Sequence, residues 1–391
     1  MPFAIVLGSS PTGLYALREL SKSGFRTALG DRERGCAWYS RLITGGRYCG
    51  SVEDVCDWAL RCADRQTGKA ILIPTSDIFI EAAINRFQEL SSQIALFSCY
   101  KQLGRSLLDK YHFYELCQQH GIESPRVWRA DSPNELEEIA RFISFPCILK
   151  PQLIHRARSL LSGKKVLIVR SALEMRNLLA TMPEDSGGWL IQEIIPGPES
   201  EITLVAAAFG HDGAPLQVFS ARKLRQYPAG FGSASLVLSK PCHESENIAV
   251  SFLRDIEFRG VCGVEFKRDP RDGRLKIIEI NPRPTLWFQI THDCGYRILA
   301  SACRNLLGLE SATPQIRKEP IVWRYLLKDI ASQHFYRRFP EALPFSAPNL
   351  SAVEGAPVRS RPVFQWSDPL PSLVEPVGFL RKAVSRWSRV S

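Results

Sequence analysis

Continuous apolar runs mark the first strands of the chain. The segments Phe3–Leu7 and Ala70–Pro74 are apolar throughout, which is typical of strands buried on both faces of a parallel sheet. The first run leads into a glycine-containing turn at 8–13, a helical pattern with Leu14, Leu17 and Leu20, and a further strand at 26–29. Strand, turn, helix and strand in this order predict a βαβ unit of a doubly wound α/β domain.

The turn at 8–13 is an incomplete version of the dinucleotide-binding glycine pattern. It therefore indicates a loop beside a substrate pocket rather than a dinucleotide site. Asp77 follows the next apolar strand and opens a helical pattern at 78–90. It is interpreted either as a helix cap, together with Ser76, or as a contact for substrate.

The most informative stretch is the predicted hairpin at 261–283. Two β-rich runs, 261–266 and 275–280, flank the turn signal Asp-Pro-Arg-Asp-Gly. Glu265 lies in the first run, and Glu279 and Asn281 share one face at the end of the second. A neighbouring antiparallel strand brings Glu265 beside them.

Two carboxylates and an amide oxygen placed together repel each other unless a cation neutralises them. Oxygen ligands of this kind suit Mg²⁺, with nucleotide phosphates completing its coordination. Arg283, again on the same face, is placed to reach a phosphoryl oxygen. The alternative is a hairpin with two solvent-facing glutamates, but the apolar flanks predict that both strands are largely buried, and buried acids need a partner.

Several cations lie where an anionic partner is expected. Lys110 opens a helix, where the helix dipole disfavours a positive charge. Lys150 ends the apolar strand 145–149, and a basic loop follows at 155–164. Arg222, Lys223 and Arg225 place three positive charges in four residues before a glycine-rich loop, and this pattern favours binding of a substrate carboxylate or acyl phosphate over a solvated loop.

Composition limits the class of protein. The chain has 391 residues, 45% hydrophobic and 23% charged, and no apolar run as long as a membrane helix, so we expect two or three globular domains in the cytoplasm. The eleven cysteines contain no Cys-x-x-Cys pair and are expected to be reduced. The net charge is +10, with twelve Lys or Arg against six Asp or Glu after residue 310. No basic run alternates with aromatic residues, so nucleic acid is not an expected partner.

The motifs together resemble the ATP-grasp superfamily. The Val-Glu-Phe strand around Glu265 and the Glu-Ile-Asn-Pro-Arg strand end at 279–283 are similar to its magnesium site, and the order of Lys110, Lys150 and the Gln192-Glu193 strand also matches. The group most similar is the predicted carboxylate-amine ligases, which include D-aspartate ligase-like proteins. The resemblance covers residues 1–310.

This resemblance implies an α/β ATP-grasp fold, with an N-terminal Rossmann-like domain and two α+β lobes that clasp ATP. The implied divisions are 1–110 for the Rossmann-like domain, 111–195 for the small lobe, 196–310 for the large lobe with the metal site, and 311–391 for a basic, proline-rich extension. The implied cofactors are ATP and Mg²⁺, with Mn²⁺ as a substitute. The residues it implies are Glu265, Glu279 and Asn281 for metal; Lys110, Lys150, Gln192, Glu193, Ile195 and Glu199 for ATP, with Glu201 competing with Glu199 for the ribose; Arg283 for catalysis; and Arg222, Lys223, Arg225 and Asp77 for substrate or acyl phosphate.

The implied reaction activates a substrate carboxylate as an acyl phosphate and transfers it to an amine. The alternatives are a bicarbonate-using carboxylase or carbamoyl-phosphate-type enzyme, and a non-catalytic ATP-binding module. The expected partners are therefore a small carboxylic acid and an amine, and the sequence leaves a homo-oligomer open. A C-terminal helical pattern at 376–390 is amphipathic and either packs on the body or contacts an anionic membrane weakly.

Overall fold

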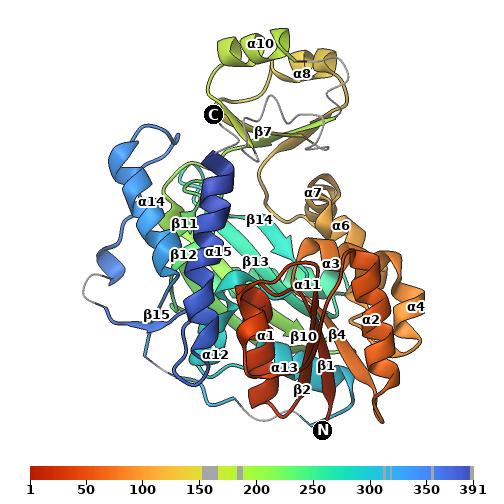
Figure 1. The fold of residues 1–391 in the computed structure, drawn as a ribbon. Helices are drawn as coiled ribbons and strands as arrows, with labels where there is room; N and C mark the ends of the chain where they lie inside the picture. Colours follow the sequence, from red (N-terminus) through yellow and green to blue (C-terminus); the bar gives the residue numbers. More distant parts are fainter. Residues whose placement is uncertain (152–165, 183–187, 311–313, 318, 354–355, 388–391) are drawn as a thin grey trace.

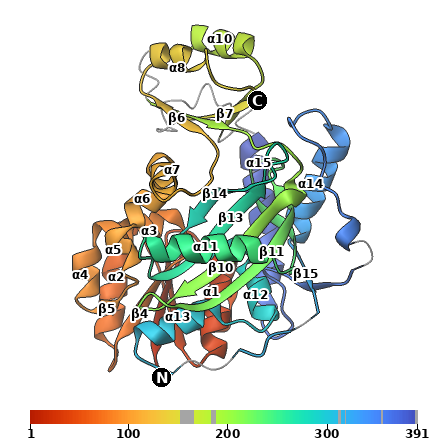
Figure 2. The same ribbon diagram turned by 180° about the vertical axis from the view of Figure 1, so that it is seen from behind.

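The computed structural model describes residues 1–151, 166–182, 188–310, 314–317, 319–353 and 356–387, which form three β-sheets with their helices. The basic loop expected at 155–164 lies outside the described residues. In Figures 1 and 2 the smallest sheet lies at one end of the molecule, and the other two sheets lie together in the body. The predicted mixed α/β class is confirmed.

The N-terminal sheet is parallel, with strand order β3-β2-β1-β4-β5. Every residue of β1 and β4 is buried, as their unbroken apolar sequences predict. Helix α1 begins after Ser10, whose side chain accepts from Thr12 N, with Pro11 in the first turn. The strands are β1 (Phe3–Leu7), β2 (Arg26–Asp31), β3 (Ile43–Tyr48), β4 (Ala70–Pro74) and β5 (Ile94–Ala95); the helices are α1 (Pro11–Lys22), η1 (Cys36–Tyr39), α2 (Val52–Asp64), α3 (Asp77–Asn85) and α4 (Phe87–Ser91).

Three short helices lead to the small lobe, which is the antiparallel sheet β6-β9-β7-β8 with α8 and α10. Its core is separate from that of the body and includes Trp189, Met175 and Leu149, each fully buried. A separate core lets this lobe hold its own shape. The elements are α5 (Cys99–Gln102), α6 (Gly104–Leu108), α7 (Lys110–Gln119), β6 (Val127–Ala130), α8 (Pro133–Ile139), β7 (Cys147–Pro151), β8 (Leu167–Val169), α10 (Ala172–Ala180) and β9 (Trp189–Glu193).

The large lobe is the seven-stranded sheet β14-β13-β10-β11-β12-β15-β16 with its helices. Its core is continuous with that of the N-terminal sheet, so the two pack as one body. The elements are η2 (Glu199–Glu201), β10 (Ile202–Phe209), β11 (Pro215–Tyr227), β12 (Ser233–Leu238), α11 (His243–Asp255), β13 (Gly260–Arg268), β14 (Leu275–Asn281), η3 (Leu286–Phe288), α12 (Gln289–Asp293), α13 (Ile298–Leu306), β15 (Val322–Arg324), α14 (Leu326–Arg338), η4 (Ser351–Val353) and β16 (Val358–Ser360).

The segment after residue 310 contributes to the body more than its sequence pattern predicts. Strands β15 and β16 extend the large sheet, and helix α15 (Leu370–Trp387) packs against η1. The helix begins six residues before the expected start and contains Pro376. A buried ion pair, Arg18 Nη2 to Asp368 Oδ2 at 3.0 Å, fixes the chain just before α15 to helix α1.

Two further features follow expectation. All eleven cysteines are free, and nine of them are buried. Within the described parts of the chain, no helix combines the length and the apolar character needed to cross a membrane.

Candidate functional site

The site is built on the antiparallel pair of β13 and β14. Glu265 lies directly opposite Glu279, and Gly263 lies opposite Asn281. Residues that face each other across a ladder point to the same side of the sheet, so both carboxylates and the amide share one face. The register shifts between Glu265 and Phe266, immediately next to the acidic pair. The predicted hairpin and the approach of the two glutamates are therefore confirmed.

Two lysines neutralise this pair. Lys110 Nζ lies 2.8 Å from Glu279 Oε1, and Lys223 Nζ lies 2.5 Å from Glu265 Oε2. The Lys223 side chain is only 2% exposed, so its charge depends on the carboxylate beside it. Each carboxylate thus has one oxygen bound to a lysine.

The electrostatic balance differs between the two acids. Burial raises the pKa of Glu265, and the charge of Glu279 adds to this effect against the opposing charge of Lys223. Burial would also raise the pKa of Glu279, but the charges of Lys110, Lys223 and Lys150 together lower that pKa to about 2. Glu279 is therefore negatively charged at neutral pH, whereas the charged form of Glu265 would be stabilised by a further cation.

These residues fit a magnesium ion. Mg²⁺ is commonly held by one or two carboxylates together with substrate phosphates. The facing pair Glu265 and Glu279 with the neighbouring amide of Asn281 supplies such a set. In the described ranges no group of three or more His, Cys, Asp or Glu forms a separate candidate metal cluster.

Lys150 extends the cationic side of the site from the small lobe. Its Nζ donates to Gln192 Oε1 at 2.7 Å, which joins strands β7 and β9 through two predicted nucleotide-binding residues. Burial lowers the pKa of Lys150 to about 7, and the charge of Lys110 adds to this, opposed by Glu279. Lys110, Lys150 and Lys223 therefore surround the two acids from three different elements.

Arg283 and Asp77 meet at the edge of the site. Arg283 Nη2 lies 2.7 Å from Asp77 Oδ1, which joins the end of β14 to the start of α3. The capping interpretation is wrong for this helix, because Ser76 occupies the N-cap position and makes no side-chain cap bond. Asp77 instead holds the guanidinium of the predicted catalytic arginine.

The cationic segment at 222–225 requires a correction. It lies near the end of strand β11, before the glycine-containing connection to β12, but each cation pairs with a carboxylate of the chain. Arg222 pairs with Glu201 at 2.9 Å, and Arg225 pairs with fully buried Asp329 at 2.7 Å. Arg225 is therefore a structural residue, because its anion is supplied by helix α14 rather than by a substrate.

Glu199 is also placed differently from the expectation. Its carboxylate is buried and accepts from Gln226 N at 3.0 Å and from Gly230 N at 2.5 Å. Burial raises its pKa, although these hydrogen bonds oppose the effect. Glu199 thus fixes the β11–β12 connection and is not placed to accept ribose hydroxyls, whereas the competing Glu201 is 38% exposed.

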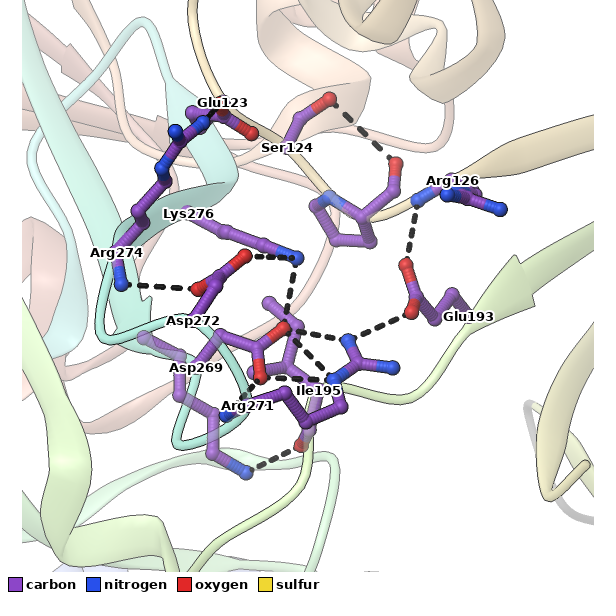
Figure 3. A network of polar contacts seen from close by, with 12 residues as sticks. Glu123, Ser124, Arg126, Glu193, Ile195, Asp269, Arg271, Asp272, Arg274 and Lys276 are labelled. Carbon is purple, nitrogen blue, oxygen red and sulfur yellow. Dashed lines mark hydrogen bonds and ion pairs between the residues drawn. The ribbon is translucent and has the colours of Figure 1, made fainter. Parts of the chain in front are cut away.

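The segment that follows β9 is held by residues that the sequence did not single out. Lys267 Nζ donates to Ile195 O at 2.8 Å and to Gly197 O at 2.7 Å. Arg271 lies 2.6 Å from Glu193 Oε1, and Figure 3 shows this arginine between Asp269 and Glu193. Two features of the sequence could have indicated these contacts. One is a lysine inside a buried strand, and the other is an unusually charged segment that was interpreted only as a turn.

Comparison with known proteins agrees with this geometry. A family profile described as ATP-grasp domain matches residues 115–302. The chain contains an ATP-grasp domain. The matched segment includes strands β7, β9, β13 and β14, which carry Lys150, Gln192, Glu265 and Glu279, respectively.

Characterised relatives share only part of the chain. A D-aspartate ligase of Enterococcus faecium is 25% identical over 225 residues, covering 55% of this chain and 53% of the relative. A formate-dependent phosphoribosylglycinamide formyltransferase of Bacteroides fragilis is 30% identical over 232 residues, covering 54% of each. The chain therefore spans about half the length of these relatives.

The fold likeness is more extensive. The N5-carboxyaminoimidazole synthetase of Staphylococcus aureus, solved in complex with ADP, superposes with a TM-score of 0.64 at 12% identity over 87% of both chains. The resemblance to the ATP-grasp superfamily is confirmed by the matched domain, and the likeness in fold extends beyond that domain.

Proposed function

We propose that this protein is an ADP-forming, ATP-dependent ligase that activates a carboxylate and joins it to an amine. The observation that carries the proposal is the facing pair Glu265 and Glu279, surrounded by Lys110, Lys150 and Lys223 within an ATP-grasp domain. A site with two acids and three cations is suited to hold a metal and a polyphosphate at once.

The lysines have separable tasks in this reaction. Lys150 and Lys110 bind the nucleotide phosphates from the small lobe and from helix α7. Lys223, which is buried beneath Glu265, keeps that carboxylate charged and oriented. Gln192 positions the Lys150 ammonium through their 2.7 Å hydrogen bond.

Glu265, Glu279 and Asn281 would hold Mg²⁺, which neutralises phosphate charge when it is bound. The substrate carboxylate oxygen attacks the γ-phosphorus, and ADP leaves with the electrons of the broken P–O bond. The amine then attacks the acyl carbon of the resulting acyl phosphate, phosphate leaves, and the amine loses a proton to solvent. Arg283 stabilises the negative charge that develops during both transfers.

The names of two matched relatives support this assignment. D-aspartate ligase is named for joining an amino acid, and the formyltransferase is named for using formate, so two matched relatives act on small carboxylates. Arg283 and Asp77 lie between the ATP-grasp domain and the N-terminal sheet, which is where we place the carboxylate and amine.

The test is phosphate release by the purified full chain with ATP and Mg²⁺, measured against pairs of amino acids, small carboxylic acids, formate, bicarbonate and amines. We expect release that requires one acid and one amine. The Glu279→Gln variant should lose this release, whereas Glu244→Gln, which removes an exposed carboxylate paired with Arg268, should keep it.

Other outcomes separate the alternatives. Release that depends on bicarbonate would identify a carboxylase-type or carbamoyl-phosphate-type reaction. ATP binding without release under any pair would favour the non-catalytic module and overturn the ligase proposal for the substrates tested.

A further inference from the structure

The small lobe is joined to the body by two chain crossings. Residues 120–126 lead from α7 into β6, and residues 193–201 lead from the last residue of β9 into β10. The crossings touch each other, because Arg126 N donates to Glu193 Oε2 at 3.0 Å and Glu193 N donates to Arg126 O at 2.9 Å. Any rotation of the small lobe relative to the body must therefore bend the backbone at these two crossings.

The turn between β13 and β14 contacts both crossings. Arg271 Nη2 lies 2.6 Å from Glu193 Oε1, and Arg274 Nη1 lies 2.5 Å from Glu123 Oε1. Ile277 N also donates to Glu123 O at 2.8 Å. Figure 3 shows Arg271 reaching Glu193 at the end of β9 and Arg274 reaching towards Glu123, both from this turn.

Asp269 makes this turn rigid. Its carboxylate is fully buried and accepts from Arg271 Nε at 2.8 Å, while Lys276 Nζ lies 2.7 Å from its Oδ2. The hydrogen bonds from Arg271 and Lys276 hold the pKa of Asp269 well below its usual range, despite its burial. Arg271 is therefore fixed on one side by a buried anion and presents its other side to Glu193.

Lys267 holds the second crossing from the same strand. Its bonds to Ile195 O and Gly197 O come from a side chain that is 7% exposed. Lys267 is two residues after Glu265 on β13, so the candidate metal carboxylate and the support of the crossing are about 7 Å apart along one strand. A nucleotide that contacts both the crossing and the metal site would then be held in position by one rigid strand.

We infer that Arg271 is a positioning residue for the nucleotide. Through Glu193 it fixes the backbone at 193–197 against β13, and so sets the distance between this crossing, which carries the predicted ATP-binding residues Glu193 and Ile195, and the Glu265–Glu279 pair. This inference rests on the proposed binding of ATP. It assigns to the charged turn a task that neither the metal ligands nor the phosphate-binding lysines perform.

The test is a double-variant cycle on Arg271 and Glu193 in the full chain, with the Kd for Mg-ATP measured by calorimetry. Arg271→Met and Glu193→Gln should each weaken binding about fivefold, as expected for a partly exposed ion pair. The double variant should bind no more weakly than Arg271→Met alone, because the interaction between Arg271 and Glu193 is already lost in that variant. Arg271→Lys should recover part of the affinity, since it keeps a charge near Glu193.

A matched control separates positioning from loss of surface charge. The Arg129 side chain is 42% exposed, close to the 44% of Arg271, and it pairs with nearby Asp131, so Arg129→Met should leave the affinity unchanged. Urea unfolding of each variant checks that the fold is retained. Unchanged affinity in Arg271→Met, or effects that add in the double variant, would overturn the inference, whereas an unaltered chain that fails to bind ATP would overturn the proposed function and this inference with it.

Discussion

Lys110 Nζ lies 2.8 Å from Glu279 Oε1, so the first residue of helix α7 is bound to strand β14. A lysine at a helix start is opposed by the helix dipole, and the sequence suggested that a bound anion compensates it. In the structure the compensating anion is Glu279. The same carboxylate is a proposed metal ligand, so a bound metal ion and Lys110 would share this one side chain.

This shared role predicts how Glu279→Gln changes binding. The amide removes a negative charge next to Lys110 and Lys150, so ATP without metal should bind at least as tightly as it does to the unaltered protein. The gain in affinity on adding Mg²⁺ should fall about tenfold or more, because a metal-ligating carboxylate is lost. Calorimetric titration of ATP with and without Mg²⁺ measures both effects. Glu244→Gln is the control, and a variant that still gained the full Mg²⁺ effect would show that Glu279 is not a ligand.

The arrangement of Glu265, Glu279 and Asn281 could be predicted from sequence because it depends on short-range rules. Side chains in a strand alternate with a period of two, and a short turn brings the second strand beside the first. The fully apolar β1 and β4 were predictable for a similar reason, since only strands covered on both faces have such sequences.

The roles of Arg225 and Glu199 could not be predicted, because their partners are distant in the chain. Asp329 lies 104 residues after Arg225, and Gly230 lies 31 residues after Glu199. A charged side chain looks available for a ligand until the structure shows which internal group neutralises it. The same applies to Arg271, whose bridge to Glu193 joins segments on different sheets.

Lys150 should make ATP affinity depend on pH. With its pKa lowered to about 7, this lysine is half neutral at pH 7 in the free protein, whereas phosphate binding needs its charged form. Above pH 7 each bound ATP should therefore take up close to one proton, and affinity should fall by up to about tenfold per pH unit. Calorimetry at pH 8 in two buffers of different ionisation enthalpy counts the proton.

The control for this prediction is Lys150→Arg, which stays charged throughout the range. It should bind ATP with little proton uptake and a flat pH profile. Equal proton uptake in the unaltered protein and in Lys150→Arg would place the titrating group elsewhere.

Breaking the Arg18–Asp368 pair should destabilise the body. Both side chains are at most 4% exposed, and Asp368 also accepts from Ser40 Oγ at 2.9 Å. Asp368→Asn leaves the guanidinium buried without a charge partner, so we expect a loss of about 3–5 kcal/mol in the free energy of unfolding. Urea denaturation measures it. Asp131→Asn, which breaks an exposed pair, should cost under about 1 kcal/mol, and equal losses for the two variants would contradict the argument.

The turn after β1 should tolerate no side chain at Gly13. A Cβ there would lie 1.9 Å from Gly8 O, and a backbone oxygen on a packed turn has little room to move. Gly13→Ala should therefore lower the free energy of unfolding by about 1–3 kcal/mol, the usual cost of overpacking, and displace the turn. Gly45→Ala is the matched control, since nothing lies within 4 Å of a Cβ at that position, and its effect should stay within about 0.5 kcal/mol. Urea denaturation of both variants checks this, and equal midpoints would mean that the turn rearranges at no cost.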